Sequence, residues 1–176
     1  MTDLSNDGLK TRAATLIAAY AERGWMIATA ESCTGGLVAG LLTEIAGSSA
    51  VVERGFVTYS NAAKAEAIGV PMELIETHGA VSEPVARAMA EGALARSHAQ
   101  VAVAITGVAG PGGGSAAKPV GLVHFGLART GRETIHLERR YGDLGREEVR
   151  RCAVAEALGL LERALADQAP ASEDGR

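Results

Sequence analysis

Aromatic residues are scarce in this chain of 176 residues: they make up 3% of it, with one tryptophan, three tyrosines and two phenylalanines. A core must therefore be built from alanine, valine, leucine and isoleucine, and hydrophobic residues reach 47% of the composition. A chain of this length and composition is expected to form one domain that needs neither metals nor disulfide bonds. We predict a single domain over residues 1–176, with an ordered core over about 8–167 and a flexible tail over 168–176.

Features that would indicate export, a membrane or nucleic acid are also missing. The two cysteines, Cys33 and Cys152, are far apart and form no CxxC pair, so the expected location is a reducing cytoplasm. The first residues are polar and acidic, unlike a signal peptide, and no apolar run reaches the roughly 18 residues that a membrane span needs. The net charge of −4 argues against a nucleic-acid partner but allows a local basic pocket for a small anion.

The spacing of apolar residues alternates between helical and strand patterns along the chain. Asp7 is the expected cap of the first helix and Gly24 its end. We predict helices over about 8–23, 35–45, 71–76, 82–97 and 146–167, a further helix that starts at 61, and strands over about 25–30, 51–59, 101–106, 120–129 and 133–141. The last two strands pair as a hairpin. The predicted fold class is therefore α/β, a three-layer α/β/α domain with a mixed sheet of about five strands.

The stretch 30–36, Ala-Glu-Ser-Cys-Thr-Gly-Gly, lies where the first strand ends and an apolar helix begins. The first turn of a helix has unpaired N–H groups and a partial positive charge, which can hold an oxyanion or a phosphate. Gly35 and Gly36 would let a ligand approach the backbone closely. Ser32 or Thr34 could instead simply cap the helix. Glu31 could bind a ligand or pair with a cation.

A second polar stretch, Tyr59-Ser60-Asn61, follows the strand at 51–59 and precedes Lys64. If Asn61 caps the next helix, Lys64 is its third residue, where a cation faces the positive end of the helix dipole. That position and burial would both lower the pKa of Lys64, which makes an amine a usable general base. The alternative is a solvated lysine that tolerates a small electrostatic cost.

A glycine-rich loop over 107–119 separates two strands. It could be a flexible hairpin connection. It could also form a concave nest of backbone N–H groups for an anion, to which Lys118 adds charge. It is neither a dinucleotide-binding fingerprint, because a strand follows it, nor a P-loop, which needs Gly-Lys followed by Ser or Thr.

Ligand sites of open α/β sheets collect where strands end, so these three stretches are expected to meet. Ser32 and Lys64 in one pocket suggest nucleophilic acyl transfer, in which the amine takes the hydroxyl proton and amides near Thr34-Gly35-Gly36 hold the oxyanion. Tyr59 could relay a proton or orient the amine. Cys33 is the alternative nucleophile, since thiols at helix N-termini are activated, although no histidine is near it in sequence.

The remaining titratable residues indicate no further site. The four histidines, at 78, 98, 124 and 136, have no metal-ligand spacing, so no metal is assigned. The pairs Arg139-Arg140 and Arg150-Arg151 are interpreted as solvent-facing.

With these stretches in hand, the sequence resembles the C-terminal domain of the competence/damage-inducible CinA family over roughly residues 8–167. The matching stretches are 30–36, 59–64, 79–82, and 106–115 leading into 118–121. Members of this family include nicotinamide-nucleotide amidohydrolase, which converts nicotinamide mononucleotide into nicotinic acid mononucleotide and ammonia. The resemblance therefore implies Ser32 as nucleophile and Lys64 as base, with Tyr59 assisting and no cofactor. The resemblance thus favours the interpretation of Ser32 as a nucleophile over its interpretation as a helix cap.

The oxyanion- and substrate-binding residues expected from the stretches and the resemblance together are Glu31, Cys33, Thr34, Gly35, Gly36, Asn61, Thr106, Gly107, Gly110, Gly112, Gly113, Gly114, Ser115 and Lys118. Some members have an acidic residue just before the loop lysine, where this chain has Ala117. The expected partner is a small pyridine nucleotide, with no nucleic acid or membrane. The apolar faces of the helices at 8–23 and 146–167 would also allow a homodimer. The alternative function is a non-catalytic nucleotide-binding or regulatory module.

Overall fold

Five strands form one mixed sheet in the computed structural model, which describes residues 3–167; the tail predicted over 168–176 lies outside the described residues. The strands are β1 (Ile27–Glu31), β2 (Val52–Val57), β3 (Val101–Gly107), β4 (Leu122–Arg129) and β5 (Ile135–Arg140). Their order across the sheet is β2-β1-β3-β4-β5. β1 is parallel to β2 and β3, whereas β3, β4 and β5 are successively antiparallel. The predicted mixed sheet is confirmed.

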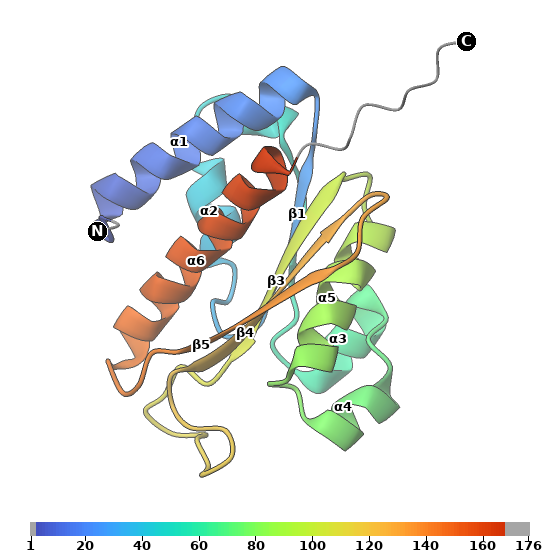
Figure 1. The fold of residues 1–176 in the computed structure, drawn as a ribbon, viewed down its shortest axis with the longest axis vertical. Coiled ribbons are helices and arrows are strands. Elements are labelled where there is room, and N and C mark those ends of the chain that lie inside the picture. Colours follow the sequence, from blue (N-terminus) through green and yellow to red (C-terminus); the bar gives the residue numbers. More distant parts are fainter. Residues whose placement is uncertain (1–2, 168–176) are drawn as a thin grey trace.

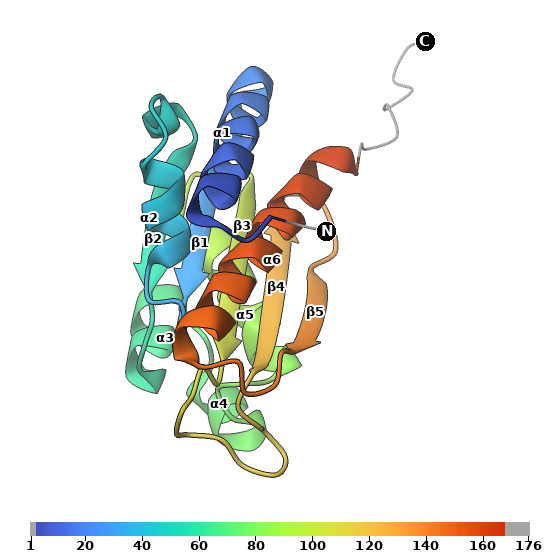
Figure 2. The ribbon, with the colours of Figure 1, turned by 90° about the vertical axis from the view of Figure 1, so that its left-hand side faces the viewer.

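Helices cover both faces of this sheet (Figures 1 and 2). One layer holds α1 (Asn6–Arg23), α2 (Leu37–Thr43) and α6 (Arg146–Ala166), and the other holds α3 (Asn61–Ile68), α4 (Met72–His78) and α5 (Glu83–Ala95). A 3-10 turn, η1 (Ser48–Ala50), leads into β2. The domain is therefore the predicted three-layer α/β/α arrangement. Within residues 3–167, every helix is too short or too polar to span a bilayer.

The core consists of one apolar cluster on each face of the sheet. Alternate residues of β1 supply both clusters: Ile27 packs with α1, α2 and α6, and Ala28 and Ala30 pack with α3, α4 and α5. The second face is lined by small residues, which brings α5 close. A Cβ added to Gly126 would lie only 2.3 Å from the carbonyl oxygen of Ala86, so this close packing requires glycine.

Two helix caps lie one or two residues before those predicted. Ser5, not Asp7, caps α1 by accepting a hydrogen bond from the amide of Gly8. Ser60, not Asn61, caps α3, so Lys64 is the fourth residue of that helix rather than the third. Both caps have extended backbone, as a cap requires, and sequence alone does not say which of several adjacent polar residues adopts it. The predicted end of α1 at Gly24 is confirmed.

The parallel strands β2, β1 and β3 are neighbours, so the segments that follow them emerge at the same edge of the sheet. This edge is the lower end of the domain in Figures 1 and 2, where the loop after β3 and helices α3 and α4 lie. The antiparallel strand β4 begins at the same edge, because Thr106 near the end of β3 lies opposite His124 near the start of β4. The three polar stretches of the sequence thus share one end of the fold.

Candidate active site

Ser32 and Lys64 meet at this edge. The amine nitrogen of Lys64 lies 3.0 Å from Ser32 Oγ and donates a hydrogen bond to the carbonyl oxygen of Thr58, at 2.8 Å. The Lys64 side chain is buried, with 1% of its surface exposed. Burial lowers the pKa of Lys64, because desolvation disfavours the charged amine. Among residues 3–167 no carboxylate forms a salt bridge with Lys64, and the Cys33 thiol raises the pKa of Lys64 by less than burial lowers it.

The backbone holds Ser32 at the end of the central strand. Its amide donates to the carbonyl oxygen of Ile105 on β3, at 2.9 Å. Its own carbonyl oxygen accepts from the amide of Gly35, at 3.0 Å, which closes a four-residue turn. The hydroxyl therefore projects from a segment that is fixed on both sides. We refer to residues 32–35 as the nucleophile turn, after the role that the sequence predicts for Ser32.

Glu31, the residue before Ser32, caps α2. Its carboxylate accepts hydrogen bonds from the amides of Gly36, Val38 and Ala39, at 3.1, 3.1 and 2.9 Å. It is 1% exposed, and its hydrogen bonds go to the first turn of the helix. The capping role expected of Ser32 or Thr34 belongs to Glu31 instead.

The amides predicted to hold an oxyanion are partly occupied. Gly35 donates to Ser32 and Gly36 donates to Glu31, so neither offers a free N–H. The amides of Cys33 and Thr34, in contrast, donate to no other residue among 3–167. These two follow Ser32 directly, and the amide after a nucleophile is a common oxyanion donor.

Arg150 on α6 binds the other side of the nucleophile turn. Its Nε donates to the carbonyl oxygen of Cys33 and its Nη2 to that of Thr34, both at 3.1 Å. Arg150 is half-buried. The interpretation of Arg150 as solvent-facing is therefore wrong. Its neighbour Arg151 pairs with Glu148 on the same helix.

Cys33 lies inside the protein and is not activated as a thiolate. Only 6% of its surface is exposed, and burial raises the pKa of its thiol to about 11. Because the thiolate is the reactive form, this environment favours Ser32 over Cys33 as nucleophile. The hydroxyls of Thr34, the next residue, and of Thr58, which follows β2, are buried without a hydrogen-bond partner among residues 3–167. Buried hydroxyls of this kind usually bind water or a ligand.

Tyr59 lies at the surface. It is 61% exposed, and its hydroxyl accepts a hydrogen bond from Arg146 Nη2 at 3.0 Å. Arg146 Nη1 also donates to the carbonyl oxygen of Gly110, at 3.0 Å. Within residues 3–167 the Tyr59 hydroxyl has no hydrogen bond to Ser32 or Lys64. Arg146 thus links the segment after β2 to the glycine loop.

The glycine loop is closed at its base and open at its tip. The amide of Ser115 donates to the carbonyl oxygen of Lys118, and the amide of Lys118 donates to Ser115 Oγ. The amides of the exposed residues 112–114 donate to nothing among residues 3–167, as an anion nest requires. The Lys118 amine, however, donates to the carbonyl oxygen of His78 at the end of α4, which directs its charge away from the tip.

The other predicted residues have backbone or peripheral positions. Thr106 Oγ1 donates to the carbonyl oxygen of Ala80, at 2.8 Å. Gly107 ends β3 opposite Val123, and Asn61 is the exposed first residue of α3. Whether these residues touch a substrate stays a prediction.

Sequence reasoning missed Arg146 and Arg150. They are four residues apart in the first turns of α6, so both lie on one face of that helix. The sequence signal that could have found them is a pair of arginines at this spacing at the start of a helix.

A histidine pair lies on β4 and β5, with His124 buried and His136 half-buried. His124 Nδ1 and His136 Nε2 are 2.9 Å apart and the rings stack, with centroids 5.2 Å apart. Each ring also approaches a carboxylate: Glu138 at 3.8 Å and Glu83 at 3.5 Å. Over residues 3–167, no group of three or more histidine, cysteine or acidic side chains is arranged to hold a metal ion.

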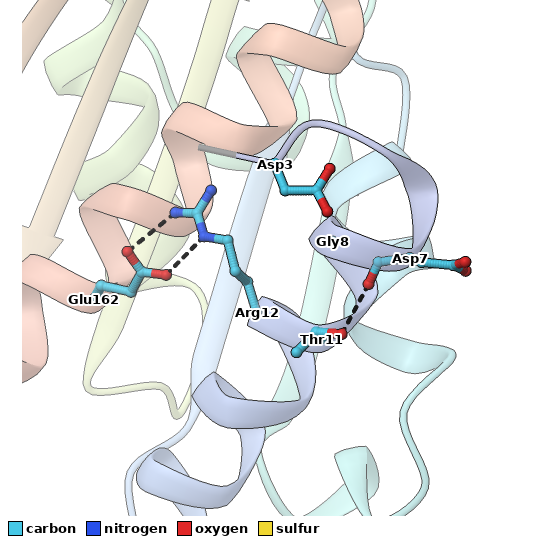
Figure 3. A pocket seen from close by; sticks show the side chains of 6 residues that line it. All are labelled: Asp3, Asp7, Gly8, Thr11, Arg12 and Glu162. Atoms are coloured by element: carbon cyan, nitrogen blue, oxygen red, sulfur yellow. Dashed lines mark hydrogen bonds and ion pairs between the residues drawn. The ribbon is translucent and has the colours of Figure 1, made fainter. Parts of the chain in front are cut away.

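A cavity at the start of α1 lies apart from this site (Figure 3). Its lining residues are Asp3, Asp7, Gly8, Thr11, Arg12 and Glu162. Across it, Arg12 donates two hydrogen bonds to the carboxylate of Glu162, at 2.9 and 3.0 Å. This ion pair joins α1 to α6.

The chain is similar to known proteins over most of its length. The family model described as the CinA C-terminal domain matches residues 9–165. A CinA-like protein of Anaeromyxobacter dehalogenans is 54% identical over 151 residues, which are 85% of this chain and 36% of that protein. A CinA-like protein of Mycobacterium sp. (strain JLS) is 57% identical over 145 residues, 82% of this chain and 34% of that protein. The chain therefore spans about a third of the length of these curated relatives.

Solved structures match over nearly their full length. The competence/damage inducible protein CihA from Agrobacterium tumefaciens has a TM-score of 0.88 and 55% identity, covering 90% of this chain and 96% of its own. The competence damage-inducible protein A (ComA) from Klebsiella pneumoniae has a TM-score of 0.86 and 36% identity, covering 92% of this chain and 99% of its own.

Proposed function

Because the chain belongs to the CinA C-terminal domain family, we propose that it is a serine amidohydrolase that converts nicotinamide mononucleotide into nicotinic acid mononucleotide and ammonia. One observation carries the proposal: the buried Lys64 amine lies 3.0 Å from Ser32 Oγ. A buried lysine with a lowered pKa beside a serine hydroxyl is an arrangement suited to nucleophilic catalysis. The relatives' names specify no reaction, so the reaction and substrate are inferred from this pair and from the family resemblance.

In the first half of the reaction, Ser32 Oγ attacks the carboxamide carbon while its proton passes to the neutral amine of Lys64. The Lys64 amine keeps its hydrogen bond to Thr58, which leaves its lone pair for the serine proton. The tetrahedral intermediate then collapses. The C–N bond breaks, Lys64 returns the proton to the leaving nitrogen, and ammonia departs, leaving an ester on Ser32.

In the second half, water attacks the ester carbon and gives a proton to Lys64. Collapse breaks the bond to Ser32 Oγ, the proton returns to the serine, and the carboxylic acid is released. The same amine therefore acts as base and acid in each half. Both steps need a donor for the negative charge on the carbonyl oxygen, and the unpaired amides of Cys33 and Thr34 are the candidates.

The rest of the substrate would extend from the turn toward the glycine loop. The unpaired amides of 112–114 could bind the ribose phosphate. Arg146, which touches both Tyr59 and Gly110, is an exposed cation at the same end of the fold.

The deciding experiment incubates the protein with nicotinamide mononucleotide, without added metal, and measures ammonia. Release that disappears in Ser32→Ala and falls sharply in Lys64→Ala supports the proposal, provided that both variants melt cooperatively. Full activity in Ser32→Ala would contradict it. Binding of the mononucleotide without ammonia release would instead favour the non-catalytic nucleotide-binding module.

A further inference from the structure

We propose that Arg150 is a positioning residue that sets the oxyanion hole by fixing the Cys33–Thr34 and Thr34–Gly35 peptide groups, the first of which carries the Thr34 amide. This inference rests on the proposed function and extends it to a residue on the last helix. Arg150 holds the carbonyl oxygens of Cys33 and Thr34 with two N–H groups, both at 3.1 Å.

The geometry of the peptide bond determines where the Thr34 N–H points. In a planar trans peptide the C=O of one residue and the N–H of the next point in opposite directions. Among residues 3–167 the single cis bond is Gly110–Pro111, so the peptide between Cys33 and Thr34 is trans. Because Arg150 holds the Cys33 carbonyl, the Thr34 N–H must point away from the guanidinium of Arg150.

The Thr34 N–H therefore points toward the side of the turn on which Ser32 lies. Residues 32–35 form a turn closed by the bond from the Gly35 amide to the Ser32 carbonyl. In such turns the N–H of the third residue faces the side chain of the first, which is why serine hydroxyls often bond to it. The Thr34 N–H thus faces the region of Ser32 Oγ, and it is unpaired among residues 3–167.

The guanidinium of Arg150 also makes the Thr34 amide a stronger hydrogen-bond donor. A cation that binds a carbonyl oxygen polarises the peptide group and makes its N–H a better donor. Arg150 does so for the peptide that contains the Thr34 amide. Its two donors lie in one rigid plane, so both carbonyls are held in a fixed relation that a lysine could not reproduce.

The contrast with Arg151 supports a specific role. Arg151, which is half-buried like Arg150, pairs with Glu148 one turn away on the same helix. Arg150, by contrast, crosses to a segment 116 and 117 residues away in the chain and binds only backbone there.

The experiment compares Arg150→Met, Arg150→Lys and the control Arg151→Met. Methionine keeps the apolar stem and removes both donors, whereas lysine restores one. For Arg150→Met we expect kcat for ammonia release to fall by about 10²-fold, the scale of a misplaced catalytic group, with KM and the pH profile unchanged. Arg150→Lys should recover part of the rate, and Arg151→Met should keep it. A fall confined to KM, or no fall in either Arg150 variant, would overturn the inference.

A second readout does not depend on the substrate. A fluorophosphonate probe reacts with an activated serine through a tetrahedral centre whose oxygen occupies the oxyanion hole. Labelling at Ser32 should be fast in the wild type and in Arg151→Met, and slow in both Arg150 variants with unchanged melting temperatures. Equal labelling of all variants overturns the role of Arg150 and leaves the serine mechanism standing. Absent labelling of the wild type at Ser32 overturns the mechanism and the inference together. Labelling without ammonia release rejects only the substrate, and the labelling rates still decide the role of Arg150.

Discussion

Glu31 and Ser32 are adjacent in the chain, yet their side chains serve opposite layers of the domain. The Glu31 carboxylate binds amides at the start of α2, whereas Ser32 Oγ lies beside Lys64 of α3. The two helices cover opposite faces of the sheet (Figure 1). Side chains alternate between faces along a strand, so the end of β1 both anchors one helix and carries the proposed nucleophile.

Lys64→Met should remove activity while stabilising the fold. Methionine keeps the length of the side chain and removes the base, and general-base catalysis typically contributes about 10²–10⁴-fold. The pKa of Lys64 is lowered in the folded protein, so at neutral pH the unfolded chain holds this proton more tightly and the native state is penalised. Ammonia release and urea unfolding measure the two effects, with the exposed Lys10→Met as control. Loss of stability would identify Lys64 as a structural residue instead.

The rate should rise with pH through the lowered pKa of Lys64 and level off above it, because only the neutral amine accepts the serine proton. This rise of the rate with pH should be absent from the residual activity of Lys64→Met. A kcat that stays constant from about pH 5 to 9 in the wild type would argue against a lysine base.

Glu31→Gln should destabilise the protein by about 1–2 kcal/mol, the usual scale for loss of a helix cap. The carboxylate accepts three backbone hydrogen bonds, whereas a glutamine side chain has one acceptor oxygen. Because the same bonds hold the end of the nucleophile turn, kcat should fall as well. Chemical denaturation and ammonia release test this, with Glu44→Gln, a surface partner of Lys10, as control. Equal stability of both variants would show that the cap contributes nothing measurable.

Tyr59→Phe should distinguish a proton relay from a binding role. The Tyr59 hydroxyl accepts from Arg146, which also binds Gly110, so we expect the loss to appear mainly in KM and to stay below about 10-fold in kcat, less than general acid–base catalysis contributes. Arg146→Met should have a similar effect, and the double variant should be no worse than the sum, as for residues in one network. A fall in kcat comparable to that of Lys64→Met would assign the proton relay to Tyr59.

Acidification should weaken the fold through the histidine pair. The pKa values of His124 and His136 are both lowered, mainly by burial and, for His124, also by the neighbouring ring. Below the ordinary histidine pKa of about 6.5, the unfolded chain therefore takes up more protons than the folded one, and the free energy of unfolding falls as the pH decreases. His124→Gln should flatten this dependence, whereas the exposed His98→Gln should leave it unchanged. Identical slopes for all three proteins would exclude the pair as the cause.

The sequence predicted the fold and the meeting of Ser32 with Lys64, because both depend on periodicity and on where strands end. It did not reveal that Glu31 caps α2, since this depends on which face a side chain takes at the last residue of a strand. Arg150 was missed because its contacts cross 116 and 117 residues of sequence, and beside Arg151 it looked like part of a charged surface. Local patterns report on local structure, and both residues act through contacts that only the assembled fold creates.

The contact between α6 and the nucleophile turn also sets an order in time. Arg150 follows Cys33 by 117 residues in the chain, so its bond to the Cys33 carbonyl can form only once α6 has docked on the sheet. Contacts of such long separation are late to form. After dilution from denaturant, recovery of activity should therefore lag behind recovery of the circular-dichroism signal of the sheet. Activity would then appear only once the complete native state has formed.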